Sequence, residues 1–221
     1  MANKSRRNAP KSRRPNEPGE QSIPSDAETS TATVQSSVQQ TRWRPTVWTW
    51  LAITVTVVGT VIRLWDLGGK SLWFDEALSI ADSRSLQSGF GSGFHPPIFY
   101  YLLHAWLPFS ESSDSLVRLV AAVPGALTVL AVYLAGWRFF NERAGVLAAA
   151  VLAVASLHVE YSQEVRMYAL AALLTTLATV ALAELMRRWP TASNGTKWRL
   201  AISYTVLAYF AIATHYLSVL P

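Results

Sequence analysis

The sequence predicts an all-α membrane protein, a multi-spanning bundle of about five helices with interfacial helices in its first outer loop. The 221 residues are 51% hydrophobic and only 15% charged, whereas soluble domains carry about 25% charged residues. The apolar residues gather in blocks of roughly 17–22 residues, enough to cross a hydrocarbon core of about 30 Å. The blocks are continuously apolar rather than alternating, which favours helices as the spanning form.

The first 45 residues are unlike the rest of the chain. They are rich in Ser, Thr, Gln, Pro and basic residues and show almost no apolar periodicity. Such a segment cannot bury enough apolar surface to offset its ordering entropy, so residues 1–45 are predicted to be a disordered basic cytoplasmic tail. We do not interpret the tail as a signal peptide, because its basic stretch is too long and no apolar core follows immediately.

Five candidate spans follow the tail. They cover residues 47–65, 116–137, 144–157, 167–186 and 200–217. The third is short, and we expect it to run a few residues further at one end. The connection between the first two spans, residues 66–115, is long, and a connection of that length usually has structure or function of its own.

The basic residues predict the orientation. With a cytoplasmic N-terminus, the inner side holds 14 of the 19 Lys and Arg residues, as the positive-inside rule favours. Eight of the 14 acidic residues fall on the outer side. We therefore predict a multi-pass protein of the cell membrane with its N-terminus in the cytoplasm. The net charge of +5 follows from this topology, so no nucleic-acid partner is expected despite the basic character.

The first motif, SLWFDEAL at residues 71–78, places two adjacent carboxylates just past the outer end of the first span. A carboxylate partly removed from water has a raised proton affinity, which suits a general base that deprotonates a hydroxyl. Alternatively, Asp75 is the N-cap of a helix over 76–86, with Glu76 in its first turn. The two interpretations are compatible and both stay open.

The second motif begins at His95 and continues with Pro96 and Pro97 into an aromatic run that contains Tyr100. A proline at the first helical position followed by about ten apolar residues predicts a helix too short to span the membrane. Tyr and Trp favour the interface, so we expect this helix to lie there. His95 is either a phosphate contact or a plain interfacial polar residue, whereas His104 is expected to serve helix packing.

The third motif, residues 160–168, places Glu160, Glu164, Arg166 and Tyr168 in a short outer turn between two spans. Charged groups at a membrane boundary usually face a cavity or pair with one another. A guanidinium offers planar, permanently charged donors that suit phosphate. The alternative is a solvated turn with a Glu–Arg pair. Taken together, the three motifs fit an enzyme that handles a lipid-linked anionic substrate at the interface.

The motifs SLWFDEA (71–77), HPPIFYY (95–101) and YSQEVRMYAL (161–170) resemble the polytopic glycosyltransferases of the C-type fold. The sequence is similar to the bacterial relatives of protein O-mannosyltransferases and of lipid A aminoarabinose transferases. The resemblance runs from about residue 63 to 168 in the same order. One departure is His158, which stands where relatives often have proline. Members of this family are much longer, so residues 46–221 correspond to the N-terminal part of a transmembrane glycosyltransferase domain.

This resemblance implies an inverting transferase that moves a sugar from a polyprenyl-phosphate donor to an acceptor hydroxyl of a protein, lipid or glycan on the outer face of the membrane. It implies catalytic roles for Asp75 and for Glu76 beside it. The implied substrate-binding residues are His95, Tyr100, Glu164, Arg166 and Tyr168. No cofactor and no metal ligand are assigned, and a divalent cation at the phosphate is left open.

Two alternatives to an active enzyme remain at this stage. A transporter or scaffold is one, although the ionisable residues of a transporter would more often lie in the middle of a span. An inactive truncated paralogue is the other. We also expect residues 1–221 to insert into a membrane but to transfer no sugar on their own, because five helices provide little wall around a polyprenyl chain.

Overall fold

The computed structural model describes residues 46–85, 96–110 and 112–219. The chain divides into two units, residues 1–44 and 45–221, and all described residues belong to the second. The prediction of a disordered tail therefore lies outside the described residues. Within the described ranges every regular element is a helix, which confirms the all-α membrane fold class.

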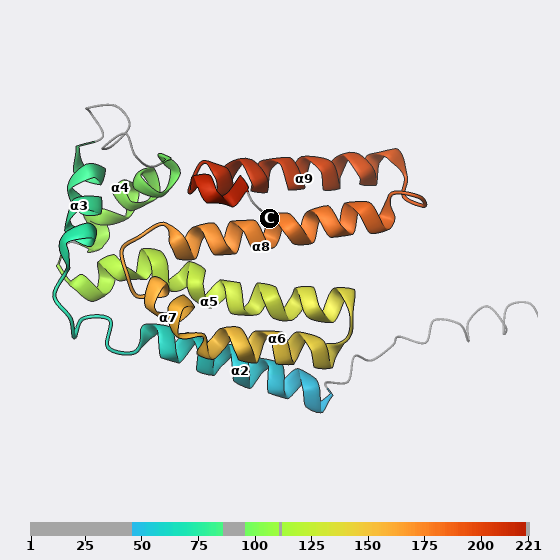
Figure 1. Cartoon of the computed structure of the whole chain (residues 1–221), viewed down its shortest axis with the longest axis horizontal. Helices are drawn as coiled ribbons and strands as arrows, with labels where there is room; N and C mark the ends of the chain where they lie inside the picture. Colours follow the sequence, from blue (N-terminus) through green and yellow to red (C-terminus); the bar gives the residue numbers. More distant parts are fainter. Residues whose placement is uncertain (1–45, 86–95, 111, 220–221) are drawn as a thin grey trace, which may run out of the picture. The chain divides into compact units, whose positions relative to one another are not determined.

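Five helices make up the bundle (Figure 1): α2 (Val47–Leu64), α5 (Asp114–Phe139), α6 (Glu142–Val154), α8 (Tyr168–Arg188) and α9 (Asn194–Ile212). In this bundle α2 packs against α5 and α6, α5 packs against α6 and α8, and α8 packs against α9. The α5–α6 contact is close because of two glycines. A Cβ added at Gly136 would lie 2.6 Å from the Cα of Gly145, so only small residues allow these helices to approach in this way.

Three of the five predicted spans are confirmed as helices long and apolar enough to cross a membrane, namely α2, α5 and α8. The predicted span 144–157 is wrong at its end. Here α6 stops at Val154, and α7 (Ser156–Ser162) continues at an angle of 66°, so the pair counts at most as one broken span. The outer turn predicted after it is therefore partly helical.

The predicted span 200–217 is also interrupted. Here α9 ends at Ile212, and a separate 3-10 helix, η2 (Tyr216–Val219), follows. Lys197 and Arg199 lie in the first two turns of α9, and these charges lower the hydropathy of the helix. It does not qualify as a span by length and composition among the described residues.

The break between α6 and α7 is stabilised by Arg63, the last basic residue of α2, which is completely buried. Its guanidinium donates to the carbonyl of Leu152 at 3.0 Å and to that of Ala153 at 3.1 Å. These carbonyls belong to the last turn of α6, where carbonyls have no partner further along the same helix; the Leu152 carbonyl also accepts from the Ala155 N–H at 3.3 Å. Arg63 therefore caps a helix that ends inside the protein.

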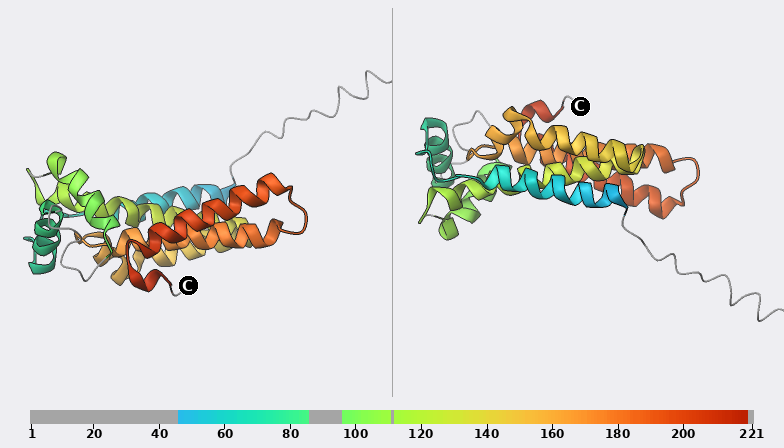
Figure 2. Two further views of the ribbon diagram at one scale, coloured as in Figure 1. Left: turned by 90° about the horizontal axis from the view of Figure 1, so that it is seen from above. Right: turned by 90° about the horizontal axis from the view of Figure 1, so that it is seen from below.

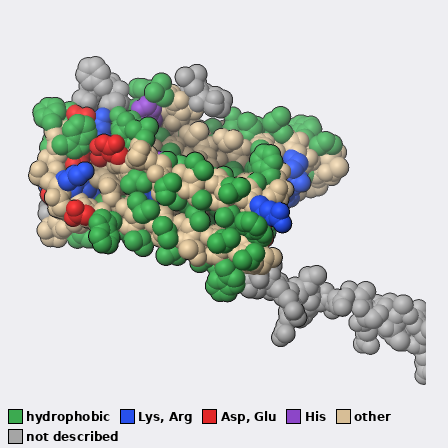
Figure 3. All heavy atoms as spheres, turned by 60° about the horizontal axis from the view of Figure 1, so that its bottom comes forward, with side chains coloured by type: hydrophobic (Ala, Val, Ile, Leu, Met, Phe, Trp, Pro, Cys, Tyr) green, Lys and Arg blue, Asp and Glu red, His purple; other side chains and the backbone are tan. Residues whose placement is uncertain are grey.

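The connections of the bundle gather at its two ends. Short helices α3 (Phe74–Arg84) and α4 (Ile98–Ser110) lie at the same end as α7 and the connection into α8, whereas the α5–α6 and α8–α9 connections lie at the opposite end (Figures 1 and 2). On the face drawn in Figure 3, acidic side chains occur at the α3 end, and basic side chains without acidic ones occur at the other. The predicted outer motifs thus share one end.

An apolar cluster fixes α4 on α5 and on the segment that enters α8. Its buried members are Ile80, Phe99, Leu103, Leu107, Val117, Val120, Ala121, Val165, Met167 and Ala169. His104 of α4 adds a hydrogen bond to α3, since its Nδ1 lies 2.8 Å from the carbonyl oxygen of Ser83. This packing holds the first turn of α3 against residues 165–168, where the candidate site is built.

Candidate active site

The first turn of α3 carries both carboxylates of the first motif. The helix begins at Phe74 with Trp73 as its N-cap, so the prediction of a helix over 76–86 capped by Asp75 is wrong by two residues. The reason is that the Glu76 carboxylate accepts a hydrogen bond from the Trp73 backbone N–H at 3.3 Å. An acidic side chain at the third helical position commonly reaches back to the N-cap in this way. Asp75 and Glu76 therefore both lie inside the helix.

Glu76 forms a buried ion pair with Arg118 of α5. The Nε and Nη2 atoms of Arg118 donate to the two carboxylate oxygens at 3.0 and 2.8 Å, and the side chains of Arg118 and Glu76 are 5% and 0% exposed. The backbone N–H of Val165 also donates to Glu76, at 2.9 Å. We call Glu76, Arg118 and Val165 the Glu76 anchor. It joins α3, α5 and the connection into α8.

The charge of Glu76 is fixed by its partners. Burial alone raises the pKa of this carboxyl, but the hydrogen bonds from Arg118, Val165 and Trp73 and the charge of Arg118 outweigh it, so the pKa lies below its ordinary value of 4.5. Glu76 is thus an ionised carboxylate with both oxygens in use and no exposed surface. This environment suits a residue that holds other groups in place rather than one that takes up a proton.

Sequence reasoning did not assign Arg118 to the site. Besides its bond to Glu76, this guanidinium donates to three carbonyls of the loop before α3, those of Leu67, Lys70 and Ser71, at 2.5, 2.8 and 3.3 Å. The available signal was an arginine near the start of a helix of apolar composition, because such a charge in a membrane protein usually has a partner.

Asp75 faces a different set of groups. Its side chain is 37% exposed, and its carboxylate lies 3.7 Å from Nη2 of Arg166, whose side chain is 9% exposed. Arg166 Nη1 also contacts the Ser79 hydroxyl at 3.4 Å and the Asp75 backbone carbonyl at 3.5 Å. Two predicted site residues, 91 positions apart in the chain, therefore meet at the start of α3.

Two tyrosines complete this region. The Tyr168 ring lies 5.7 Å from the guanidinium carbon of Arg166, within cation–π range. Tyr100 is 4% exposed. Burial raises the pKa of its hydroxyl above the ordinary value, although the charge of Arg166 and a hydrogen bond with Ser79 lower it. We call Asp75, Ser79, Tyr100, Arg166 and Tyr168 the Asp75 cluster. Burial lowers the pKa of Arg166, but Tyr168 and Asp75 outweigh burial and raise it, so the cluster holds a permanent cation.

Glu164 is placed next to the anchor rather than in the cluster. Its Oε2 is buried without a hydrogen-bond partner among the described residues. Burial, then the charges of Glu160 and Glu76, raise the pKa of the Glu164 carboxyl. The predicted alternative of a Glu–Arg pair within this turn is not what forms, because the ion pair of Arg166 is made with Asp75.

A polar pocket of about 540 Å³ opens beside the Glu76 anchor. Its lining comes from the loop before α3, from α5 and from the end of α7, and includes Lys70, Trp73, Glu76, Arg118, Glu160 and Glu164. The Asp75 carboxylate does not line it. The first turn of α3 thus separates two environments, the pocket on the Glu76 side and the Asp75 cluster on the other.

The structure therefore brings together four of the seven predicted site residues: Asp75, Tyr100, Arg166 and Tyr168. Glu76 and Glu164 lie together on the other side of the α3 turn. His95 lies outside the described residues. Within residues 46–85, 96–110 and 112–219, no group of three or more His, Asp or Glu side chains is placed to hold a metal ion.

The sequence profile of one protein family matches the chain. The family is described as dolichyl-phosphate-mannose-protein mannosyltransferase, and the match covers residues 94–220, which is more than half of the chain. The matched region contains Tyr100, Glu164, Arg166 and Tyr168 and begins after Asp75 and Glu76. No curated protein and no solved structure gives a significant match.

Proposed function

Because this chain belongs to the dolichyl-phosphate-mannose-protein mannosyltransferase family, we propose that it transfers a sugar from a polyprenyl-phosphate donor to an acceptor hydroxyl, with inversion at the anomeric carbon. Family membership by itself indicates a membrane glycosyltransferase related to mannosyltransferases. The donor, the acceptor and the stereochemistry are the proposal.

One observation carries the proposal: a partly exposed carboxylate stands beside a buried guanidinium. Asp75 and Arg166 lie 3.7 Å apart, with side chains 37% and 9% exposed. The carboxylate is accessible to a substrate hydroxyl, whereas the guanidinium is shielded from water and interacts more strongly with an anion for that reason. Sugar transfer from a phosphate carrier needs both groups, a base for the acceptor and a cation for the leaving phosphate.

The reaction assigns a role to each group. The acceptor oxygen forms a bond to the anomeric carbon while its proton passes to the Asp75 carboxylate. The bond from the anomeric carbon to the phosphate oxygen breaks, and the phosphate leaves with the electron pair. Attack from the face opposite the phosphate inverts the anomeric centre, and the transition state has oxocarbenium character. Arg166 stabilises the charge that develops on the phosphate.

The other residues of the site support this chemistry. Ser79 contacts the Arg166 guanidinium at 3.4 Å and Tyr168 stacks near it, so both orient the cation. Tyr100 offers a buried hydroxyl next to Ser79 and is proposed as a substrate contact. Glu76 is proposed as a positioning residue for Asp75, its neighbour in α3. His95 and Glu164 remain proposed contacts of the donor.

The decisive experiment replaces Asp75. Wild-type and Asp75→Asn protein are expressed from the native locus, and their membranes are assayed for transfer from a labelled polyprenyl-phosphate sugar. Removal of a general base typically lowers the rate by about 10²–10⁴. Asp114→Asn, at the start of α5, is the matched control and should keep its activity. Near wild-type transfer by Asp75→Asn would overturn the proposal.

The outer location of the site is proposed from the same residues. Ser71 lies near the α3 end, and Ser193 lies in the α8–α9 connection; both are exposed. A cysteine at Ser71 should react with a membrane-impermeant thiol reagent added to intact cells, whereas a cysteine at Ser193 should react only after lysis. The opposite pattern would place the Asp75 cluster on the cytoplasmic face.

A further inference from the structure

The end of the bundle opposite α3 carries three arginines that have no part in the proposed reaction. Arg138 lies in the last turn of α5, and Arg187 and Arg188 are the last two residues of α8. All three guanidiniums contact the carboxylate of Glu184. Nη2 of Arg138 donates to it at 2.8 Å and Nη2 of Arg187 at 3.0 Å, and Nε of Arg188 also contacts it. We call these four residues the Glu184 cluster.

The cluster depends on how the helices pack. Arg187 and Arg188 follow Glu184 by three and four positions, the ordinary spacing for an ion pair on one helix. Arg138 is 46 positions away and comes from α5. Because α6 and α7 return between them, α5 and α8 both run from the α3 end toward the opposite end (Figure 1). The positive-inside rule predicts basic residues at this end, but it does not predict that they converge on one carboxylate.

The cluster has an excess of positive charge. One carboxylate opposes three guanidiniums, and the ends of α5 and α8 contribute only about half a negative charge each. Lys197 of α9 adds another cation, since its Nζ lies 5.2 Å from the ring of Trp189, the residue that follows Arg188. Glu142, the other acidic residue at this end of the described chain, accepts at 2.7 Å from two threonine hydroxyls at the start of α2 instead. The cluster therefore attracts a second anion.

The guanidiniums are accessible to such an anion. The side chains of Arg138, Arg187 and Arg188 are 40%, 48% and 47% exposed, whereas that of Glu184 is 12% exposed. Each guanidinium carries several N–H donors and contacts the carboxylate through one or two of its nitrogens. Glu184 thus holds the three groups together from the protein side. Their planar geometry suits the oxygens of a phosphate.

Exposed apolar side chains stand next to the arginines. Trp137 and Phe140, on either side of Arg138 in the sequence, are 46% and 79% exposed. Met186 and Trp189, which flank the two arginines of α8, are 69% and 56% exposed. Tryptophan is enriched where the hydrocarbon of a membrane meets water. This surface therefore matches a molecule that has an anionic group and hydrocarbon chains.

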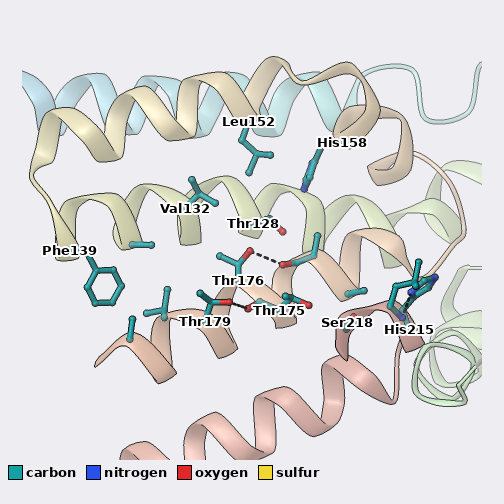
Figure 4. Close-up of a pocket in the computed structure, with 16 residues that line it drawn as sticks. Thr128, Val132, Phe139, Leu152, His158, Thr175, Thr176, Thr179, His215 and Ser218 are labelled. Atoms are coloured by element: carbon teal, nitrogen blue, oxygen red, sulfur yellow. Dashed lines mark hydrogen bonds between the residues drawn. The ribbon is translucent and has the colours of Figure 1, made fainter. Parts of the chain in front are cut away.

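The groove between α5 and α8 is a separate feature. Phe139 lies at one end of this cavity of about 600 Å³, whereas His158 and His215 lie toward the other end (Figure 4). None of the described residues that line the groove is Lys or Arg. The groove thus offers no cation to a phosphate at its Phe139 end, and an anion that arrives there is bound by the Glu184 cluster on the surface.

We propose that the Glu184 cluster binds the phosphodiester headgroup of an anionic phospholipid from the leaflet around this end of the bundle, with the acyl chains against the exposed apolar side chains. Basic pockets between helices at the cytoplasmic side of membrane proteins bind anionic headgroups in this way. With the orientation proposed above, the leaflet is the cytoplasmic one. The inference does not depend on sugar transfer. The bound lipid links the ends of α5 and α8 and so stabilises the bundle.

The first test measures lipid enrichment on the whole chain. The chain is reconstituted in nanodiscs of phosphatidylglycerol and phosphatidylcholine, and native mass spectrometry counts the lipids that stay bound on release. We expect phosphatidylglycerol to be enriched on the wild-type chain. Arg138→Gln should lower the enrichment about fivefold, the factor for one basic residue at an anionic surface. Arg138→Lys keeps the charge and should retain most of the enrichment.

Arg143→Gln is the matched control. It removes the same charge at the same end, but the guanidinium of Arg143 lies 5.3 Å from the ring centre of Trp48 and does not contact Glu184 within the described part of the chain. Its enrichment should equal that of wild type. An equal loss in Arg143→Gln and Arg138→Gln, or no enrichment on wild type, would overturn the site. Displacement of the lipid by soluble glycerol phosphate would make the ligand a free phosphate and overturn the lipid assignment.

The second test uses stability. Glu184→Gln leaves the guanidiniums together without their carboxylate, so it should lower the unfolding temperature in phosphatidylcholine nanodiscs. In nanodiscs that contain phosphatidylglycerol, a lipid phosphate replaces the missing anion, and the loss should be clearly smaller. Glu142→Gln removes a carboxylate at the same end that accepts from hydroxyls, and its effect should be the same in both membranes. A loss in Glu184→Gln that does not depend on the lipid would show a purely structural ion cluster and contradict the proposal.

Discussion

The Glu76 anchor and the Asp75 cluster begin at adjacent residues of α3 and provide different chemistry. Successive residues of an α-helix point about 100° apart because one turn takes 3.6 residues. Glu76 therefore meets Arg118 of α5 with both side chains buried, whereas Asp75 meets Arg166 with its own side chain 37% exposed. Both are pairs of a carboxylate and a guanidinium, but the Glu76 pair is buried whereas the Asp75 pair is partly exposed to solvent.

The difference indicates how a structural ion pair in this protein differs from the pair that we propose to be reactive. In the anchor, two bonds from Arg118 and one from the Val165 amide occupy the carboxylate oxygens at 2.8–3.0 Å. In the cluster, the closest approach of Arg166 to the carboxylate is 3.7 Å, so the oxygens of Asp75 can accept a substrate proton. The buried Glu76 carboxylate, whose oxygens all have hydrogen-bond donors, stabilises the fold. The Asp75 carboxylate is not fully paired, so its oxygens can still bind a ligand.

The largest expected effect is a difference in stability between variants of the two carboxylates. Glu76→Gln leaves the buried Arg118 charge uncompensated, and breaking a buried pair from one side typically costs about 3–5 kcal/mol. Asp75→Asn removes a partly exposed contact and should cost about 1 kcal/mol or less. Thermal unfolding of the two variants in nanodiscs checks this. Equal destabilisation by both substitutions would remove the distinction between anchor and cluster.

The next effect concerns the two arginines. Arg166→Lys keeps a charge but loses the planar fork that suits phosphate, and we expect kcat/KM for the lipid donor to fall about tenfold to a hundredfold, as for loss of one hydrogen bond to a charged group. Stability should change little. Arg118→Lys should instead lower the unfolding temperature, because Arg118 bonds Glu76 and three loop carbonyls. A stability loss in Arg166→Lys as large as in Arg118→Lys would contradict the assignment.

The pH dependence of stability should have opposite signs at Glu76 and Glu164. The pKa of Glu76 is lowered on folding, so its contribution is present above its ordinary pKa of 4.5 and is lost as the pH falls through the folded value. The pKa of Glu164 is raised by burial and neighbouring acids, so its contribution is present below pH 4.5 and is lost as the pH rises. Glu164→Gln should therefore be more stable than wild type at about pH 7 but not at about pH 4. Unfolding curves at both pH values provide the measurement, and an equal difference at both would be inconsistent with this view.

The smallest effect is expected for Ser79→Ala. The lost hydroxyl contacts Arg166 at 3.4 Å, a long hydrogen bond whose removal should cost about 0.5–1.5 kcal/mol. Transfer should decrease a few-fold through a higher KM for the donor, with kcat nearly unchanged. Ser83→Ala is a matched control, because Ser83 is equally buried and its hydroxyl donates to the Ser79 carbonyl and does not contact Arg166 within the described part of the chain. A similar KM change in Ser83→Ala would show that α3 packing, and not Arg166, is responsible.

Parts of this architecture follow from local sequence. Continuous apolar blocks form helices in a membrane because all their backbone groups must be satisfied internally, and α2, α5 and α8 lie where the blocks lie. The chain also showed which motifs share a side, since an even number of crossings separates them, and α3, α4 and α7 do gather at one end. Asp75 and Arg166 could be singled out because a carboxylate and a guanidinium at the membrane boundary are costly without a purpose.

The sequence by itself thus determined the helical class and three spans, and it singled out the chemical groups of the candidate site. Only the tertiary structure decided that Asp75 is partly exposed while Glu76 is buried against Arg118. It also decided that α6 ends where Arg63 donates to its last carbonyls. The physical reason is the distance along the sequence between the residues that interact. Hydropathy and helix formation depend on residues a few positions apart, whereas the pairing of a buried charge depends on which distant groups the packed helices bring within about 3 Å of it.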